Sequence, residues 1–382
     1  MYPLSEEQSN LLEKLRKLAT EQIEPHAVYV DEKGRFPRES IDALAGSGWL
    51  GLIVSRDLEG MGEGLNMACA ALDVIARHCP STAMVYLMHL CGVACYVAHP
   101  QGHEDVLRQT ARGEHLSTLA WSEKGSRSHF WAPVSQAARK NGHVLLNANK
   151  SFVTSAGQAD GYVVSTRSFD AVGPVDSTLY RVSNRDSGIR VSGYWNSMGM
   201  RGNASAPVTL ENCEIPEERA LCESGKGFSR MLEILPWFNL GNAAISIGIA
   251  EAATSEVLDH LVGTRLEHLG SRLADLPNLR ARLADMRTET DRARAHLISA
   301  LQAVQTAAPN ATLMVLESKL AAAESAMKVT DIGMQACGGS AYSKHLGLER
   351  RFRDARASSI MAPTSDVLKD FIGRALCGME LF

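Results

Sequence analysis

The residues of this sequence that could do chemistry are a hydroxyl-rich loop and isolated histidines. Residues 119–128 have the sequence LAWSEKGSRS, and a loop of such small residues lets backbone amides approach a phosphate while its hydroxyls bond a polar ring edge. His89 is a candidate for proton exchange, since an imidazole titrates near neutral pH, and His129 could serve phosphate or substrate. Each feature also has an ordinary structural explanation: the loop as a plain turn, His89 as a hydrogen-bonded core residue and His129 as a solvent-facing one.

The eight cysteines do not indicate a zinc ribbon or a redox dithiol, because no two of them form a CxxC pair. Cys91, Cys95 and His99 would lie on one helical stripe at intervals of four residues, but the sequence around them is apolar. We therefore expect reduced cysteines that pack in a core, and no metal site.

The predicted secondary structure that positions these residues changes twice along the chain, from helix to strand and back to helix. Residues 1–115 carry apolar residues at helical spacing, and Ser81 is expected to cap a helix within them. Residues 116–222 contain short β-branched and aromatic runs between turn residues, which predicts a small β domain. Residues 223–382 return to helical spacing, with a long apolar stripe over 311–330 and further helix beyond it, and predict a helical bundle.

Composition and charge are those of an ordinary folded protein. Of the 382 residues, 45% are apolar and 21% are charged, which provides for large cores and two or three domains. The formal charge of -4 and the scattered basic residues predict no nucleic-acid surface. The N-terminus is polar, unlike a secretory signal, and no uninterrupted apolar run approaches 18 residues, so we expect a cytoplasmic protein with no membrane partner.

The chain resembles the acyl-CoA dehydrogenase superfamily in motifs that occur in the family's order. The motif segments are residues 119–128, 150–155, 198–202, 335–342 and 353–366. Segment 150–155 alone would be an ordinary half-buried strand, but several motifs in the right order are far more specific than any one. The resemblance implies an α+β fold with an N-terminal helical domain, a central small β domain and a C-terminal four-helix-bundle domain. It also implies bound FAD and a homotetramer.

The resemblance further implies which residues contact FAD. The expected cofactor-binding residues are Trp121, Ser122, Ser128, Phe152, Thr154, Gln335, Gly338, Gly339, Thr364 and Asp366. Phe152 would stack on the isoalloxazine ring, Thr154 would hydrogen-bond near its N5 atom, and Ser128 would lie on the pyrophosphate side. Gln335 and the glycine pair would complete the adenine site of a neighbouring subunit.

The sequence departs from the family at the catalytic base. In the dehydrogenases a carboxylate removes the α-proton of a thioester while hydride leaves the β-carbon for the flavin. Ala362 stands where that family usually carries its catalytic glutamate, and a methyl group cannot remove a proton. Some members place the glutamate on an earlier helix, but the matching positions are Phe238 and Asn239. The family's flavin-contacting Arg-x-x-Phe-Gly segment is also altered, to residues 266–270 with Arg265 one position away.

Other residues could compensate for the missing glutamate. His89 is the candidate catalytic residue, because its segment matches one that approaches the substrate cavity in the family. His129 follows Ser128 where the family often has aspartate, and it could serve phosphate or substrate. Asp366 matches a glutamine on the FAD side and is expected to contact the cofactor or cap a helix rather than act as a base.

Three functions are consistent with these residues. The first is an FAD-dependent oxidoreductase acting on an acyl thioester, carried by CoA or a carrier protein, or on a related carbonyl compound, with a non-standard base. The second is a flavin monooxygenase of the hydroxylating or epoxyketone-forming kind, because such superfamily members often lack the glutamate. The third is a flavin-binding or structural protein that has lost catalysis, although retained Phe152, Thr154 and Thr364 argue against it. The sequence leaves open the acyl chain, its carrier and the electron acceptor.

Overall fold

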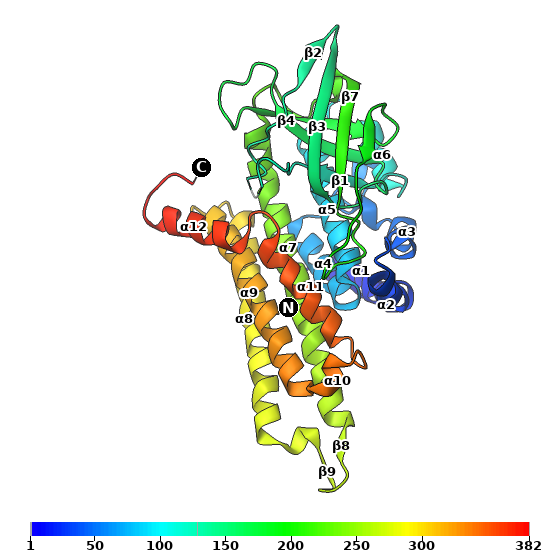
Figure 1. The fold of residues 1–382 in the computed structure, drawn as a ribbon, viewed down its shortest axis with the longest axis vertical. Coiled ribbons are helices and arrows are strands. Elements are labelled where there is room, and N and C mark those ends of the chain that lie inside the picture. Colours follow the sequence, from blue (N-terminus) through cyan, green and yellow to red (C-terminus); the bar gives the residue numbers. More distant parts are fainter. Residues whose placement is uncertain (1, 128, 382) are drawn as a thin grey trace.

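The computed structural model describes residues 2–127 and 129–381, which form helices, then sheets, then helices again. Figure 1 shows the sheets at one end of the molecule, the long C-terminal helices at the other, and the N-terminal helices beside them. The change from helix to strand falls between Ala111 and Ser117, and the change back falls between Arg219 and Gly227. This order confirms the predicted α+β class.

The N-terminal part is made of helices whose buried apolar residues form one core together with those of the C-terminal helices. They are α1 Glu6–Leu18, α2 Glu24–Lys33, α3 Arg38–Gly46, α4 Leu65–His78, α5 Pro80–Ala98 and α6 Glu104–Ala111. Helix α5 begins directly at Pro80, whose missing N–H would be unsatisfied at this position in any case. The prediction that Ser81 caps this helix is therefore wrong. The Ser81 hydroxyl instead accepts a hydrogen bond from the Gly202 amide at 3.2 Å.

Helix α5 is a core helix. Among the helices in the described part of the chain, it alone is long and apolar enough to cross a membrane. In its most apolar stretch, however, 83% of the residues are buried inside the protein. It packs against α4, α7 and β1, so its apolar surface is already covered by this fold.

The β part contains two facing sheets. Its strands are β1 Ser117–Ala120, β2 Ala138–Lys140, β3 His143–Val153, β4 Gly161–Arg167, β5 Ser177–Ser183, β6 Ile189–Val191 and β7 Ala206–Pro216. One sheet has the order β1-β4-β5 and the other β2-β3-β7-β6. Strand β1 runs parallel to β4, and the other neighbours are antiparallel. Residues of both sheets share a second core that includes Leu146, Val164 and Tyr180.

The C-terminal part is a bundle in which α7, α8, α9 and α11 pack together, as the resemblance implies. Its elements are α7 Gly227–Gly263, β8 Arg265–Leu266, β9 Ser271–Arg272, α8 Pro277–Gln305, α9 Ala311–Cys337, α10 Gly339–Tyr342, α11 Leu348–Ile360 and α12 Ser365–Leu376. Helix α9 ends at Cys337, and Gly338, whose φ of 52° suits glycine, is its C-cap.

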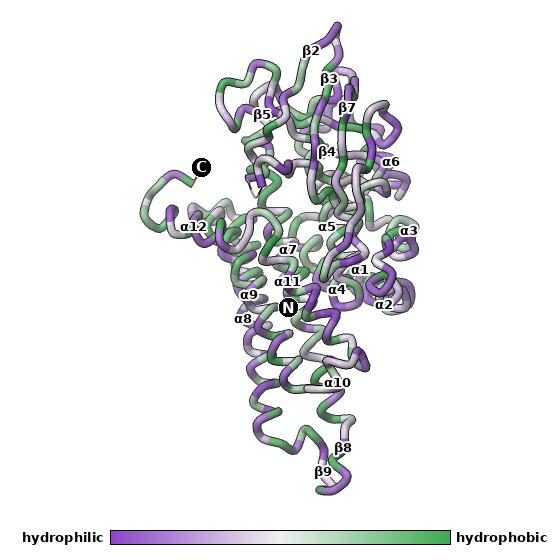
Figure 2. The backbone as a smooth tube through the Cα atoms, viewed as in Figure 1, coloured by the Kyte–Doolittle hydropathy of each residue, from purple (hydrophilic) through white to green (hydrophobic). Residues whose placement is uncertain are grey.

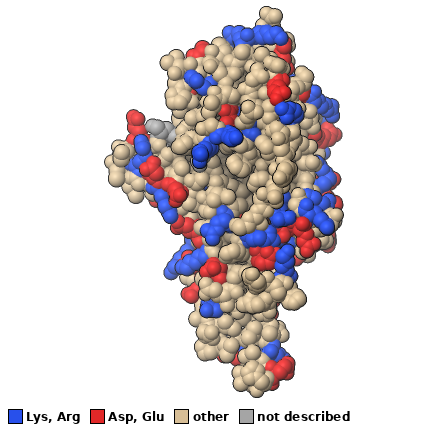
Figure 3. Space-filling model, in the orientation of Figure 1, with Lys and Arg blue, Asp and Glu red and all other residues tan. Residues whose placement is uncertain are grey.

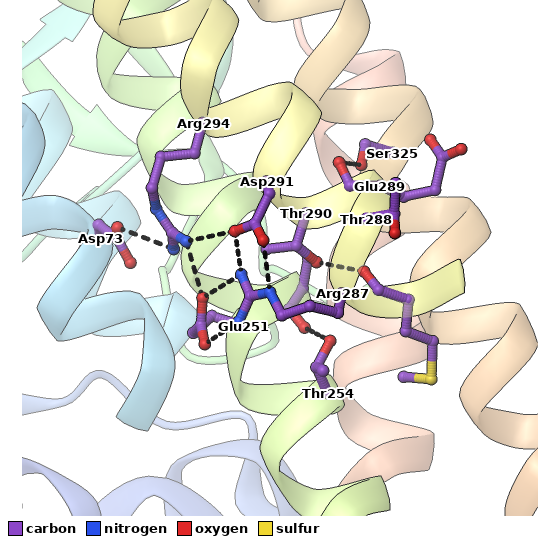
Figure 4. A network of polar contacts seen from close by, with 12 residues as sticks. Asp73, Glu251, Thr254, Arg287, Thr288, Glu289, Thr290, Asp291, Arg294 and Ser325 are labelled. Atoms are coloured by element: carbon purple, nitrogen blue, oxygen red, sulfur yellow. Dashed lines mark hydrogen bonds and ion pairs between the residues drawn. The ribbon is translucent and has the colours of Figure 1, made fainter. Parts of the chain in front are cut away.

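A network of charged side chains, of which Asp73 is buried, joins the N-terminal helices to the bundle (Figure 4). Asp73 of α4 is 1% exposed and accepts a hydrogen bond from Arg294 of α8 at 3.4 Å. Arg294 also lies 2.8 Å from Glu251 of α7, which Arg287 contacts through both guanidinium Nη atoms. Burial alone would raise the pKa of Glu251, but the two arginines lower it to about 2. These charges therefore fix α4, α7 and α8 relative to one another.

Hydrophobic and charged residues are distributed as expected for a folded domain. In Figure 2 the outer helices α1 and α2 are more hydrophilic than α5 and α7, which cross the centre. On the face drawn in Figure 3, basic and acidic side chains are interspersed, which agrees with the scattered charges of the sequence.

Candidate functional site

A cleft of about 800 Å³ lies where the β part meets α5, α7 and α11. The β part contributes β1 with the loop after it, the end of β3 and the loop before β7 to the walls of this cleft. The helices contribute residues of α5, α7 and α11 and the two residues that follow α11. Its aliphatic and phenyl lining residues are Met84, Met88, Leu119, Phe130, Phe152, Met198, Met200, Pro207, Ile234, Leu235, Phe238, Ala357, Ile360, Met361 and Ala362. Such a mainly apolar cavity with few polar groups is typical of a small-molecule site.

Phe152 projects into this cleft because β3 is irregular where it ends. The pairing of β3 with β7 shifts register between Lys150 and Val153, and Phe152 adopts a φ of 55°. Positive φ is unusual for a bulky side chain and often marks a functional position. The ring is 72% exposed and lies edge-on to Trp195, with 6.4 Å between ring centroids. The backbone thus presents a large apolar face to the cleft.

Polar groups suited to a heteroaromatic ring lie beside Phe152. The Thr154 and Ser205 hydroxyls both line the cleft and are 2.9 Å apart. The Trp121 indole N–H is buried and has no hydrogen-bond partner among the described residues, and Ser122 lines the same wall. A buried donor without a partner is costly, which suggests that a bound molecule accepts from it. This combination of a stacking face, hydroxyls and an unused donor fits the flavin that the sequence resemblance implies.

A buried ion pair supports the loop that carries Trp121 and Ser122. Lys150 Nζ donates to Glu123 Oε1 at 2.6 Å, and the two side chains are 0% and 5% exposed. Glu123 Oε2 also accepts from the Val134 and Ser135 amides. Burial alone would raise the pKa of Glu123, but the Lys150 ammonium and hydrogen bonds from Ser135 hold it below its usual value. The charged pair thus ties β3 to both ends of the loop.

Two of the positions that match the family's base sites belong to the lining of the same cleft. Ala362 and Phe238 line the cleft, whereas Asn239 does not. Among the described residues that line it, no histidine, tyrosine or aspartate occurs, and Glu123 is the one carboxylate. Glu123 is paired with Lys150, so this lining offers no unpaired carboxylate as a proton acceptor.

The geometry of His89 does not support the prediction that it replaces the base. Its side chain is 0% exposed and lies outside the cleft lining. The Nε2 atom lies 2.9 Å from the Leu50 carbonyl, and Nδ1 accepts from the Ser117 amide at 3.0 Å. Both ring nitrogens are therefore used by the backbone, and burial lowers the pKa of His89 to about 4. His89 is a core residue that joins α5 to β1.

The remaining residues near the expected FAD site lie at its margins. Ser128 is outside the described residues. His129 is exposed, absent from the cleft lining, and edge-on to Trp131 at 5.0 Å between centroids. The Thr364 hydroxyl caps α12 by accepting from the Val367 amide, and Asp366 lies in the first turn of that helix, where its charge is favourable. Neither Thr364 nor Asp366 lines the cleft.

The expected adenine-binding residues lie elsewhere in the protomer. Gln335, Gly338 and Gly339 are exposed near α10, at the end of the bundle far from the sheets in Figure 1. Gln335 Nε2 donates to Asp331 at 2.8 Å. The altered segment 266–270 forms the tip of the β8–β9 hairpin at the same end. The structure therefore does not bring these segments to the cleft of their own protomer.

Two features of the site were missed in the sequence. Lys319 of α9 is fully buried beneath the wall that carries Ala362, with its Nζ 5.3 Å from the Phe238 ring centroid. The signal was present, since Lys319 follows the buried Val315 by four residues and so lies on the inward stripe of α9. Trp195 comes from an irregular segment before β7 with no periodic pattern, and nothing local indicated its contact with Phe152.

Known proteins share both the sequence pattern and the fold. Three domain profiles match: acyl-CoA dehydrogenase N-terminal domain at residues 5–114, middle domain at 118–213 and C-terminal domain at 225–377. Cyclohex-1-ene-1-carbonyl-CoA dehydrogenase of Geobacter metallireducens is 30% identical over 98% of this chain and 99% of its own. Acryloyl-CoA reductase (NADH) of Anaerotignum propionicum is 28% identical over 98% of this chain and 95% of its own.

Solved structures show the same architecture. Butyryl-CoA dehydrogenase from Megasphaera elsdenii superimposes with a TM-score of 0.93 at 24% identity, covering 99% of this chain and 100% of that one. The FAD complex of PigA superimposes with a TM-score of 0.91 at 19% identity, covering 99% of each chain. At these identities the superpositions establish the fold.

Proposed function

Because the chain belongs to the acyl-CoA dehydrogenase family and is therefore an FAD-dependent oxidoreductase, we propose that it acts on an acyl-CoA thioester in the cleft. The observation that carries this proposal is the large apolar cleft between the exposed Phe152 ring and the wall at Ala362. The names of two relatives, which specify cyclohexene-carbonyl-CoA and acryloyl-CoA, support a CoA thioester as the substrate class.

The proposal assigns the cofactor to one wall of the cleft and the acyl group to the rest. Phe152 would stack on the flavin, while Thr154 and the Trp121 indole would hydrogen-bond its polar edge. Bound FAD would supply the hydride acceptor. Met84 and Met88 of α5 and Ile234 of α7 would contact the acyl chain and exclude water from it.

Basic residues at the cleft support binding of the phosphates of FAD or CoA. Lys124, Arg127 and Arg356 are exposed, line the cleft, and form no ion pair within the described part of the chain. Arg127 has a φ of 50°, a conformation that costs an L-residue about 1–3 kcal/mol. Unpaired cations in a chain of net charge -4 indicate an anionic ligand at this site.

The missing base supports a second candidate, a flavin monooxygenase. The described cleft residues offer no unpaired carboxylate, and an oxygenation does not require removal of an α-proton. No cleft residue specifies an oxygenation substrate, so the acyl-CoA oxidoreductase with a non-standard base remains our first proposal.

One experiment separates the two functions. Purified holoprotein is mixed without oxygen with a panel of acyl-CoA thioesters, and the oxidised-flavin absorbance is followed. A slow loss of absorbance together with an enoyl-CoA product supports the oxidoreductase. No loss with any thioester, followed by incorporation of labelled oxygen into the substrate when the chemically reduced protein meets dioxygen, supports the monooxygenase and overturns the first proposal.

Replacing Phe152 by alanine is expected to weaken FAD binding by about 10- to 100-fold, because a stacked aromatic ring contributes about 1.5–3 kcal/mol through apolar burial. The measurement is titration of apoprotein with FAD, followed by flavin fluorescence. Tyr194→Ala is the matched control, because Tyr194 is an aromatic residue 82% exposed that does not line the cleft. An equal effect of both changes, or no FAD binding by the unmodified protein, would contradict this assignment.

We also expect a dimer or tetramer whose stability depends on FAD. Since Gln335 and Gly338 are far from the cleft of their own protomer, their expected adenine contact requires a second subunit. A cofactor shared between subunits links binding to assembly by mass action. Sedimentation velocity of the holo and apo forms measures this link. An FAD-saturated monomer at micromolar concentration would refute it.

A further inference from the structure

Lys319 is an unusual residue because its charge is buried without a carboxylate partner. Its side chain is 0% exposed, and it takes part in no ion pair among residues 2–127 and 129–381. A buried ammonium of this kind costs several kcal/mol unless strong hydrogen bonds compensate for lost water. Lys319 Nζ donates to the Met361 carbonyl at 2.7 Å and to the Pro363 carbonyl at 2.6 Å. Bonds from a charged donor are stronger than neutral ones.

The two accepting carbonyls lie on either side of Ala362. Lys319 therefore holds the peptide unit directly before Ala362 and the peptide unit that follows Pro363, so the backbone is fixed on both sides of the Ala362 side chain. Its Nζ also lies 5.3 Å from the centroid of the Phe238 ring, within the range of a cation–π contact. Both wall positions where the family carries its base are thus held by one side chain from α9.

The turn between α11 and α12 has few other polar contacts. The Met361 amide makes the last hydrogen bond of α11, to the Ala357 carbonyl at 3.1 Å. From α7, Asn242 Nδ2 donates to the Met361 sulfur at 3.4 Å, and the Ser358 hydroxyl donates to the side-chain Oδ1 of Asn242. A sulfur is a weak acceptor, so the two bonds from Lys319 are the strongest polar contacts between this turn and the bundle.

We propose that Lys319 is a positioning residue that fixes the substrate-facing wall at Ala362 and Phe238. The inference rests on the proposed function only in taking this wall as part of the substrate cleft. Burial lowers the pKa of Lys319 to about 7, and a neutral amine would still have enough N–H groups for both carbonyls. The two hydrogen bonds from Lys319 to the carbonyls therefore do not require a permanent charge, whereas its cation–π contact with the Phe238 ring does.

The test compares Lys319→Met and Lys319→Gln with the unmodified holoprotein. The methionine has a similar length and removes the buried charge, so the fold is expected to remain as stable or become more stable. Backbone amide hydrogen exchange reports the turn directly and does not depend on any substrate. We expect exchange at the hydrogen-bonded amides of Met361, Val367 and Leu368 to become about ten-fold faster in Lys319→Met, since about 1.4 kcal/mol of local stabilisation is lost. In Lys319→Gln, which keeps one donor group, the exchange rates are expected to lie between those of the unmodified protein and those of Lys319→Met.

Lys328→Met is the matched control, because Lys328 lies on the same helix but is exposed and pairs with Glu289. It should leave exchange in the turn unchanged. A second measurement is the titration of each holoprotein with an acyl-CoA, followed by the flavin spectrum. The apparent Kd of the acyl-CoA should be higher in Lys319→Met than in the unmodified protein, and it should recover in part in Lys319→Gln. Unchanged exchange in both Lys319 variants would overturn the proposal. Loss of folding in both would also overturn it, because Lys319 would then serve the core and not the wall.

Discussion

Replacing Ala362 by glutamate is expected to raise the rate of acyl-CoA dehydrogenation by about 100- to 10,000-fold, the factor that a positioned general base commonly supplies. This gain is expected because Ala362 lines the cleft, and because the described lining residues offer no unpaired carboxylate that could already act as the base. The unmodified protein should accordingly bleach its flavin slowly or not at all with straight-chain acyl-CoA thioesters. Anaerobic stopped-flow absorbance measures both rates.

The control for this gain is Ala357→Glu. Ala357 also lines the cleft, one turn earlier on α11, so this change adds the same charge at another position of the same wall. The new carboxyl at residue 362 would lie beside Phe238 and Met361 and must be ionised to accept a proton. The gained rate should therefore increase with pH as that carboxyl ionises. Fast bleaching of the unmodified protein by ordinary acyl-CoA thioesters would mean that another group performs the proton transfer.

The fold follows from the sequence because its signals are local and repeated. In α8, for example, Met286, Leu297 and Leu301 recur at helical spacing and are all buried. The runs at Tyr162 and Leu179 likewise fall inside β4 and β5. The hydrophobic spacing of a helix is repeated over many residues, so one exception does not hide it. The position of a helix end, in contrast, depends on one or two residues. The wrong prediction for Ser81 concerns such a helix end, since α5 begins at Pro80 and the Ser81 hydroxyl accepts a hydrogen bond from Gly202, which is far away in the sequence.

The site was less predictable because its contacts join residues far apart in the chain. The partners of His89 lie 39 and 28 residues away, so its apolar neighbours in the sequence gave no sign that both nitrogens are occupied. The exposure of Phe152 depends on a register shift against β7, which the alternation of β3 does not contain. Lys319 contacts carbonyls 42 and 44 residues away, and carbonyls are present at every position, so no sequence pattern marks them.

Replacing Lys150 by methionine is expected to lower the free energy of unfolding by about 3–5 kcal/mol, the usual cost of removing one partner from a buried ion pair. Lys150 is 0% exposed, and its Nζ also donates to the Trp121 carbonyl at 3.3 Å and to the Ser165 carbonyl at 2.5 Å. Without it, the Glu123 carboxylate would remain buried and uncompensated. Urea unfolding, followed by circular dichroism, measures the change.

A second change separates the charge from the shape of this pair. Glu123→Gln in the Lys150→Met background keeps an acceptor for the Val134 and Ser135 amides but removes the unpaired charge, so much of the lost stability should return. The control is Lys140→Met, which breaks an exposed pair with Glu214 and should cost no more than about 1 kcal/mol. Because Glu123 also anchors the loop that carries Trp121 and Ser122, Lys150→Met should weaken FAD binding, and Lys140→Met should not. Equal effects of the two lysine changes on stability and on FAD affinity would show that the buried pair holds neither the fold nor the loop.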